Sequence, residues 1–206
     1  PTQPTTFKEL FGANMAASDL ASAPPSASKT EAVSRSRIYE FLWQLEEVKR
    51  LRKLDKAKAI FLRLFTLQSE LPSEVTSLHR LCRTGWRILL GMHIELGSYQ
   101  ELSAFLDTYS NVYGLHDADR LICLLKHFIS KDQLDVASDL WNDAVANNLA
   151  DERGYTILAR KFSMIGSFNR ACSLLDAAWN QALEASDFKI TRVYYEAAAE
   201  VYIRAG

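Results

Sequence analysis

The sequence predicts an all-α protein, a right-handed α-solenoid of antiparallel helix pairs that follows a flexible N-terminal tail. Two observations carry this prediction. From residue 36 onward, apolar residues recur at the 3.6-residue helical period, with short breaks between stretches. Similar eight-residue segments also recur at spacings of 45, 35 and 34 residues. Because one helix pair cannot bury its own apolar faces, repeated pairs need one another as neighbours.

Residues 1–35 are rich in Ser, Ala, Thr and Pro, and beyond Phe7, Leu10 and Phe11 they offer little to bury. We predict a flexible tail over 1–35 and a helical-repeat domain over 36–206. The few acidic residues in the tail are compatible with a region downstream of a removed organellar presequence, and a plain linker is the alternative. A start at Pro1 and an unfinished last repeat suggest a fragment of a longer protein.

Two apolar stripes predict the first helix pair, because each places its members on one helical face. They are Ile38, Phe41, Leu42, Leu45 and Val48, followed by Leu54, Ala57, Ile60, Phe61, Leu64 and Phe65.

Capping and helix-breaking residues predict where other helices begin or break. Ser73 is predicted to cap the helix that follows Pro72, with Glu74 in its first turn, where the helix dipole favours a carboxylate. Gly85 lies inside that helix, and because glycine costs about 1 kcal/mol relative to alanine, it predicts a break or a close helix contact. Ser186-Asp187 is predicted to cap a last helix, Phe188 to Arg204.

Four segments align without gaps: LDKAKAIF, YQELSAFL, LDVASDLW and FNRACSLL. Each begins with a large apolar residue, at Leu54, Tyr99, Leu134 and Phe168. The third residue after each leader, usually small, would let two helices approach, and the seventh would fill the space between them. Thirteen positions before each leader stands another large apolar residue: Phe41, Trp86, Leu121 and Tyr155. We therefore predict about four helix pairs, the last incomplete.

This pattern resembles the tetratricopeptide and pentatricopeptide repeats. Signature positions of the tetratricopeptide pattern are occupied by Tyr155, Leu158, Ala159, Phe162, Gly166, Phe168, Ala171 and Ala178, and one pair earlier by Trp86, Leu89, Leu90, Gly97 and Tyr99. His93 stands where a large apolar residue is expected, and the terminal proline of that family is missing. Ala150-Asp151 through Gly154-Tyr155 looks like the pentatricopeptide Pro-Asp-x-x-Thr-Tyr entry, and this resemblance is slightly favoured.

The pentatricopeptide resemblance implies a non-enzymatic scaffold for single-stranded RNA in organellar gene expression or translation, with the mitochondrial matrix as the expected location. In that family a polar residue two positions after the Tyr-type position helps to select a base. Ile157 and Cys123 stand there, and neither reads a base edge by hydrogen bonding. The tetratricopeptide resemblance implies the alternative, a protein- or peptide-binding module or a subunit of a larger assembly; outside these settings, a cytoplasmic location is the default.

Basic residues on the predicted concave face are the candidate binding groove for RNA or a peptide. They are Lys126 and Arg160, at matching places in successive units, with Arg153, Lys161 and Arg120 nearby. Stacking would bring them into one ladder that suits phosphates or an acidic peptide, and a solvated surface is the alternative. A secondary basic patch comprises Lys49, Arg50, Arg52 and Lys53, where a solvated helix end is the favoured interpretation.

Composition excludes several classes of function. A net charge of −1 argues against strong electrostatic binding of nucleic acid, although it leaves room for a local basic groove. No apolar run approaches the roughly 18–20 residues that span a bilayer. No phosphate loop, GxSxG or metal-hydrolase motif is present, so we predict no catalytic residues, cofactor or small-molecule substrate.

The three cysteines, Cys82, Cys123 and Cys172, lie in apolar stretches, which predicts reduced thiols used as small hydrophobes. His79 with Cys82 and Cys123 with His127 have ligand-like spacings, but ordinary packing is favoured over a metal site.

Overall fold

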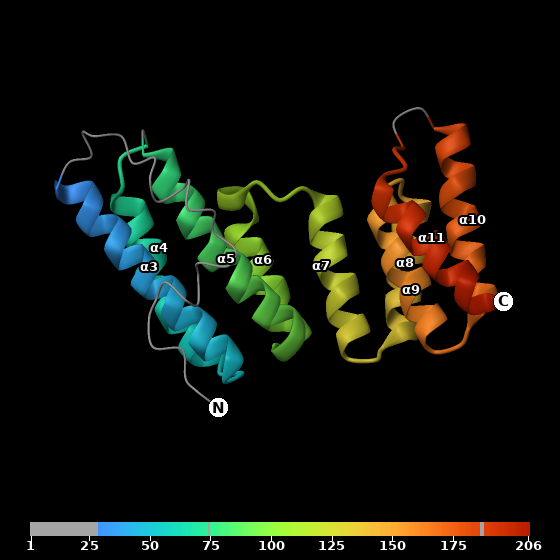
Figure 1. The fold of residues 1–206 in the computed structure, drawn as a ribbon, viewed down its shortest axis with the longest axis horizontal. Helices are drawn as coiled ribbons and strands as arrows, with labels where there is room; N and C mark the ends of the chain where they lie inside the picture. The colour runs from blue at the N-terminus through green and yellow to red at the C-terminus, as the bar shows by residue number, and fades with distance from the viewer. Residues whose placement is uncertain (1–28, 74, 186–187) are drawn as a thin grey trace.

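The computed structural model describes residues 29–73, 75–185 and 188–206. All regular structure in these residues is α-helical, which confirms the predicted all-α class. The helices up to residue 130 follow one another across the molecule in chain order, and the later helices gather at its far end (Figure 1). The helices are α3 (Lys29–Arg50), α4 (Leu54–Glu70), α5 (Thr76–Leu96), α6 (Tyr99–Tyr113), α7 (Asp117–Ser130), α8 (Leu134–Ala146), α9 (Glu152–Met164), α10 (Phe168–Glu184) and α11 (Arg192–Ala205).

The helix contacts repeat along the chain. Helices α3, α5, α7, α9 and α11 each pack against the next in this series, and α4, α6, α8 and α10 each pack against the helix that precedes them. This is the contact pattern expected of helix pairs that stack on one another. The right-handed solenoid stays a prediction. Within the described residues, no helix has the length and apolar content that crossing a bilayer requires.

Three of the turns inside helix pairs have the same geometry. Arg52, Asp132 and Gly166 adopt left-handed φ angles of 54°, 56° and 80°, each two residues before the leader of the next helix. The following amide donates to the carbonyl five residues back, as from Ser167 N to Phe162 O at 2.8 Å. This six-to-one bond satisfies a carbonyl left open at the helix end. The turn at Gly97 differs, because Ser98 and Glu101 form a reciprocal capping box there.

The aligned positions are buried as the repeat predicts. The third residue after each leader is fully enclosed, and the seventh is almost fully so; the latter are Phe61, Leu106, Trp141 and Leu175. Apolar side chains gather into an N-terminal cluster, contributed by α3–α6, and a C-terminal cluster, contributed by α7–α11. A small cluster of Leu102, Leu106 and Cys123 joins α6 to α7.

Gly85 lies inside a continuous α5, so the helix does not break there. A Cβ at this position would stand 2.3 Å from Leu64 Cδ2 and 3.2 Å from Leu45 Cδ1. Of the two predicted explanations, the close helix contact is therefore the one that applies. A methyl group here would displace the packed ends of these leucine side chains, and glycine lets α5 lie close against α3 and α4 without that shift.

The predicted start of α5 is wrong. The helix begins at Thr76 with Val75 in the N-cap position, whereas Ser73 lies in the preceding turn. Val75 N donates to Pro72 O at 3.2 Å, and the Val75 side chain packs against the N-terminal cluster. Because residues 72–75 form this turn and Val75 packs against the cluster, the helix begins after Ser73. Glu74 lies outside the described residues.

Two further boundaries differ from the predictions. Helix α3 begins at Lys29, ahead of the predicted tail boundary at residue 35; Glu31 stands in its first turn and pairs with Arg35 at 3.5 Å. Residues 1–28 of the predicted tail lie outside the described residues. Helix α11 begins at Arg192, because the Thr191 hydroxyl accepts from Val193 N and caps the helix. The predicted cap, Ser186-Asp187, also lies outside the described residues.

Candidate functional site

The residues of the predicted groove come from two neighbouring helices. Arg120 and Lys126 belong to α7, and Arg153, Arg160 and Lys161 belong to α9. Since α7 packs against α9, the structure brings the two sets close to each other. For four of the five, however, the immediate partner is a carboxylate.

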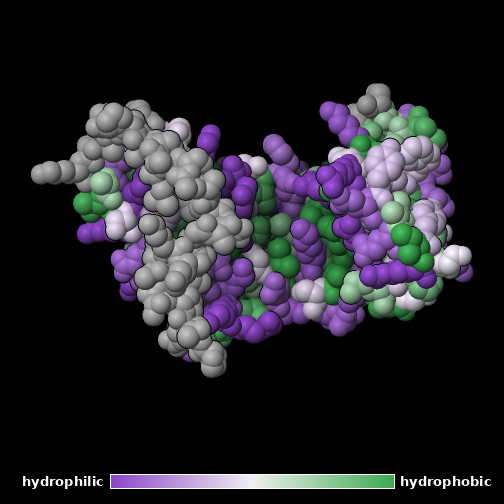
Figure 2. Space-filling view, in the orientation of Figure 1, coloured by the Kyte–Doolittle hydropathy of each residue, from purple (hydrophilic) through white to green (hydrophobic). Residues whose placement is uncertain are grey.

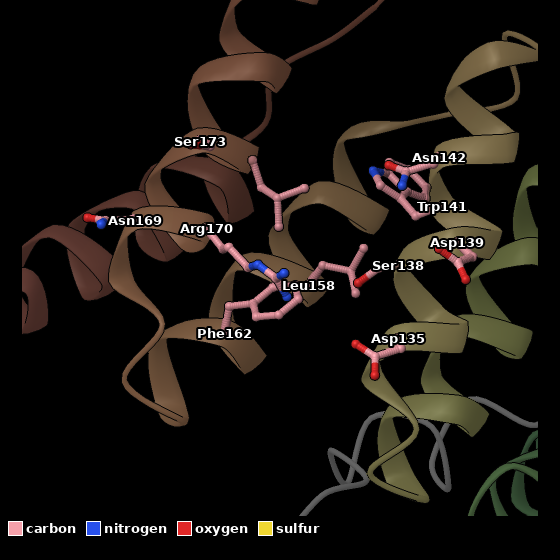
Figure 3. Close-up of a pocket in the computed structure, with 11 residues that line it drawn as sticks. Asp135, Ser138, Asp139, Trp141, Asn142, Leu158, Phe162, Asn169, Arg170 and Ser173 are labelled. Atoms are coloured by element: carbon pink, nitrogen blue, oxygen red, sulfur yellow. The ribbon is translucent and has the colours of Figure 1, made fainter.

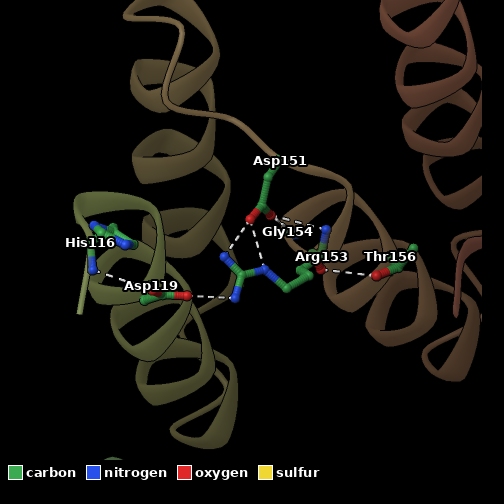
Figure 4. A network of polar contacts seen from close by, with 6 residues as sticks. All are labelled: His116, Asp119, Asp151, Arg153, Gly154 and Thr156. Carbon is green, nitrogen blue, oxygen red and sulfur yellow. Dashed lines mark hydrogen bonds and ion pairs between the residues drawn. The ribbon is translucent and has the colours of Figure 1, made fainter. Parts of the chain in front are cut away.

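Arg153 ties the beginning of α9 to the beginning of α7 (Figure 4). Its guanidinium reaches Asp119 Oδ1 at 2.6 Å and Asp151 Oδ2 at 2.5 Å. Asp151 also accepts from the backbone amides of Arg153 and Gly154 and so caps α9. The hydrogen bond from Arg153 lowers the pKa of Asp119 below its usual value. Arg153 is thus a link between two successive units of the chain.

The other predicted groove cations are paired in the same manner, with one exception. Arg160 Nε lies 3.1 Å from Glu200 Oε2 of α11, and Lys161 Nζ lies 2.6 Å from Asp132 Oδ1. Arg120 pairs with Asp107 of α6. Lys126 is exposed, and no ion pair involves it within the described residues.

Opposite charges therefore occupy matching places in successive units. Asp119 and Arg153 are 34 residues apart, and each stands two positions before the leading apolar residue of its own helix. Arg160 and Glu200 likewise join α9 to α11. Ion pairs between units at least partly neutralise the basic ladder expected from the sequence. Its use as a binding surface stays a prediction.

The secondary basic patch lies at the end of α3 and in the turn that follows. Lys49 and Arg50 occupy the last helical turn and pair with Glu46 at 3.5 Å and Glu47 at 2.6 Å. Arg52 takes the left-handed turn position, and Lys53 is the residue before α4. Cations at a helix C-terminus complement the dipole, so this patch has a structural explanation.

The two His–Cys pairs lie on different helices, one on α5 and one on α7. The histidine of each pair contacts a backbone carbonyl. Cys82 and Cys123 are buried, and burial raises the pKa of each thiol to about 11. His79 contacts Pro72 O through Nε2, and His127 contacts Ile94 O through Nδ1. In the described part of the chain, no three potential ligands of these types gather around a common point.

His93 of α5 is a buried titratable residue that was not among the sites predicted from the sequence. It is 3% exposed and stacks on Phe105, with 4.6 Å between ring centroids. Burial is the main cause that lowers its pKa to about 4, and the nearby charge of Lys58 adds to the effect. His93 stands where the repeat pattern expects a large apolar residue, and that position was the sequence signal for its burial.

Acidification should destabilise the fold through His93. In the unfolded chain the imidazole titrates near 6.5, so the unfolded state binds the proton first as pH falls. The contribution of neutral, buried His93 to the free energy of unfolding is intact above pH 6.5, and roughly 3 kcal/mol of it is lost between about pH 6.5 and 4. Urea denaturation at pH 7.5 and 4.5 measures this loss. His93→Leu should reduce it and the exposed-residue control His116→Gln should not; equal losses in both variants would contradict this role.

Glu152 was also missed by sequence reasoning. This carboxylate is 5% exposed and accepts from Thr191 N and from Thr191 Oγ1, both at 2.8 Å. It thereby holds the first residue before α11 against the beginning of α9. A glutamate in the first turn of a helix gave no reason to expect a buried acceptor.

Glu152→Ala should lower the free energy of unfolding by about 2 kcal/mol, because Thr191 N and Thr191 Oγ1 both lose the charged acceptor that fixes them to α9. Thermal and urea denaturation provide the measurement. Glu196→Ala removes an exposed pair with Arg192 on α11 and is the control, with an expected loss below about 0.5 kcal/mol. Similar losses in the two variants would show that Glu152 is not the anchor of α11.

A pocket of about 510 Å³ lies between α8 and α10 (Figure 3). Its base contains apolar side chains of α8, α9 and α10, and its walls are polar. The base residues are Trp141, Leu158, Phe162 and Leu174, and the wall residues are Asp135, Ser138, Asp139, Asn142, Asn169, Arg170 and Ser173. Arg170 lies over the Phe162 ring, with 5.5 Å from Cζ to the centroid.

Hydrophobic surface is also present on the face seen in Figure 2, near its centre over α6 and α7, with hydrophilic surface around it. Partly buried Leu90, Ile94, Leu115 and Leu124 border the small cluster in this region.

No protein-family model, curated protein or solved structure matches the chain.

Proposed function

We propose that this chain is a non-enzymatic helical-repeat scaffold that binds a partner protein, in the manner of the tetratricopeptide repeats. The proposed architecture is a right-handed solenoid. Its support is the recurring helix contacts, the shared turn geometry and the burial of aligned positions. Such stacks present long surfaces assembled from successive units, which suit extended ligands better than small molecules.

The observation that carries the choice of a protein ligand is the pairing of the predicted groove cations. Binding of single-stranded RNA draws its affinity from cations that replace the counterions of phosphates. Arg120, Arg153, Arg160 and Lys161 already have carboxylate partners, and the net charge is −1. The pairing argues against a phosphate ladder.

The two positions that would read a base also favour a protein ligand over RNA. Cys123 is buried beside Leu102 and Leu106, and Ile157 packs against the C-terminal cluster. Side chains that contribute to the core are poorly placed to meet a base. The pentatricopeptide-like alternative, an RNA scaffold in the mitochondrial matrix, therefore has less support and serves as the competing outcome of the test.

Two measurements test the proposal. Filter binding to single-stranded RNA at 50 and 200 mM salt is expected to give weak retention at both. The second measurement captures proteins from a cell lysate on the immobilised chain, with and without nuclease treatment. The same proteins are expected to be retained in both samples. Tight RNA retention that falls with salt, and that falls further in Lys126→Gln, would overturn the proposal. Loss of all captured proteins after nuclease treatment would do so as well.

A further inference from the structure

We infer that the pocket between α8 and α10, called here the α8–α10 groove, binds a segment of the partner protein that carries a lysine or arginine beside an apolar side chain. The inference rests on the proposed protein-binding function and names the place and chemistry of contact. The α8–α10 groove is separate from the cations predicted at the concave face. Its lining includes none of them, neither Arg120 and Lys126 nor Arg153, Arg160 and Lys161.

The base of the groove suits an apolar side chain. Trp141, Leu158 and Phe162 contribute to it, and at 1%, 1% and 4% exposure they are held in place by the C-terminal cluster. A base that is part of the core is rigid before any ligand arrives. A rigid apolar base reduces the ordering cost of binding, and a volume near 510 Å³ accommodates two or three side chains.

The α8 wall supplies the charge that a basic residue would meet. Asp135 and Asp139 are both exposed and stand four residues apart, so they lie on one helical face. No ion pair involves either of them within the described residues, in contrast to the carboxylates that pair with Arg153, Arg160 and Lys161. Like charges at this spacing repel one another, and a ligand cation between them would relieve the repulsion.

The opposite wall restricts where that cation can lie. Arg170 of α10 covers Phe162 and is positively charged, so a second cation would be repelled from the α10 side. A basic side chain of the partner should therefore lie against α8, with its apolar neighbour over the base. An acidic segment would show the reverse preference, because it would approach Arg170 and avoid Asp135 and Asp139.

Trp141 offers a local reporter of occupancy. The outer edge of its six-membered ring faces Gly154, and its indole Nε1 is buried without a hydrogen-bond partner in the described structure. The indole proton gives its own resonance in nuclear magnetic resonance spectra. Because Trp141 lines the groove, a bound side chain should shift that resonance while the signal of Trp43 on α3 stays in place.

The experiment uses the full chain and two fluorescein-labelled peptides, one of alternating leucine, lysine and glycine and one with glutamate in place of lysine. We expect the lysine peptide to bind, measured by anisotropy, and to shift the Trp141 indole signal, assigned with Trp141→Phe. Asp135→Asn with Asp139→Asn should weaken binding at least about three-fold. Arg170→Gln should strengthen it, and Asp143→Asn, which changes an exposed charge outside the groove on the same helix, should not alter it.

Binding that is unchanged in the double aspartate variant, an unmoved Trp141 signal, preference for the glutamate peptide, or no binding of the lysine peptide would each overturn the inference. Circular dichroism of each charge variant checks that the fold is intact, as expected because Asp135, Asp139, Asp143 and Arg170 are exposed. If the double variant still captures nuclease-resistant partners, the groove assignment fails while the proposed function stands. If the unaltered chain captures none, the proposed function itself fails.

Discussion

Trp141→Ala should lower the free energy of unfolding by about 3–5 kcal/mol, the largest loss we expect from a single substitution in this chain. The side chain is 1% exposed, and its ring meets that of Tyr155 edge to face, with 4.9 Å between centroids. It joins α8 to α9 within the C-terminal cluster. Its removal loses the transfer free energy of a large aromatic ring and leaves a cavity that the helices can only partly close.

Urea denaturation followed by far-ultraviolet circular dichroism measures this loss. The matched control is Trp179→Ala, because Trp179 is 42% exposed and stacks on Tyr194 at the side of α10. It should lose clearly less than Trp141→Ala. Equal losses in the two variants would mean that Trp141 does not connect α8 and α9 as described.

Gly154→Ala should cost about 3 kcal/mol through overpacking. A Cβ at Gly154 would stand 2.0 Å from Trp141 Cζ3 and 2.2 Å from Cη2, and contacts below 3.0 Å do not persist. The Trp141 ring is confined by the core and by Tyr155, so one of the two helices has to shift. Combining Gly154→Ala with Trp141→Phe should recover part of the stability, because the smaller ring leaves room for the methyl group.

Gly91→Ala is the control for this substitution. Apart from its two chain neighbours and the nearby backbone of α5, no atom of the described residues lies within 4 Å of the position that its Cβ would take, and the residue stands inside α5. Alanine there should raise the free energy of unfolding by up to about 1 kcal/mol, since it favours the helix. Thermal denaturation of both variants gives the comparison, and destabilisation of both by a similar amount would contradict the close approach at Gly154.

Local sequence was sufficient for the helices and for most of the core. The aligned leader segments predicted that Ala57, Ala137 and Ala171 would be enclosed, and each of them is. Apolar spacing succeeds because burial on one helical face depends only on positions along the helix itself. Boundaries were less predictable: Val75 delays α5 by packing on the N-terminal cluster, and Thr191 begins α11 because Glu152 holds it.

The candidate groove could not be predicted in the same manner. Arg160 and Lys161 were recognised as basic and outward-facing, yet their carboxylate partners come from Glu200 on α11 and Asp132 in a turn. A carboxylate 40 residues away becomes a neighbour only when α9 and α11 pack together. The α8–α10 groove likewise depends on how far apart two helices lie, which no local pattern encodes.

The spacing of apolar residues thus determined the helical class, the repeat period and the identity of the buried faces, because these properties belong to single helices and their immediate neighbours. Tertiary structure decided which charges are paired, why Gly85 and Gly154 are glycines, and where a pocket opens. Those features are set by distances between helices, and ion pairs and steric contacts change within one or two ångströms of separation.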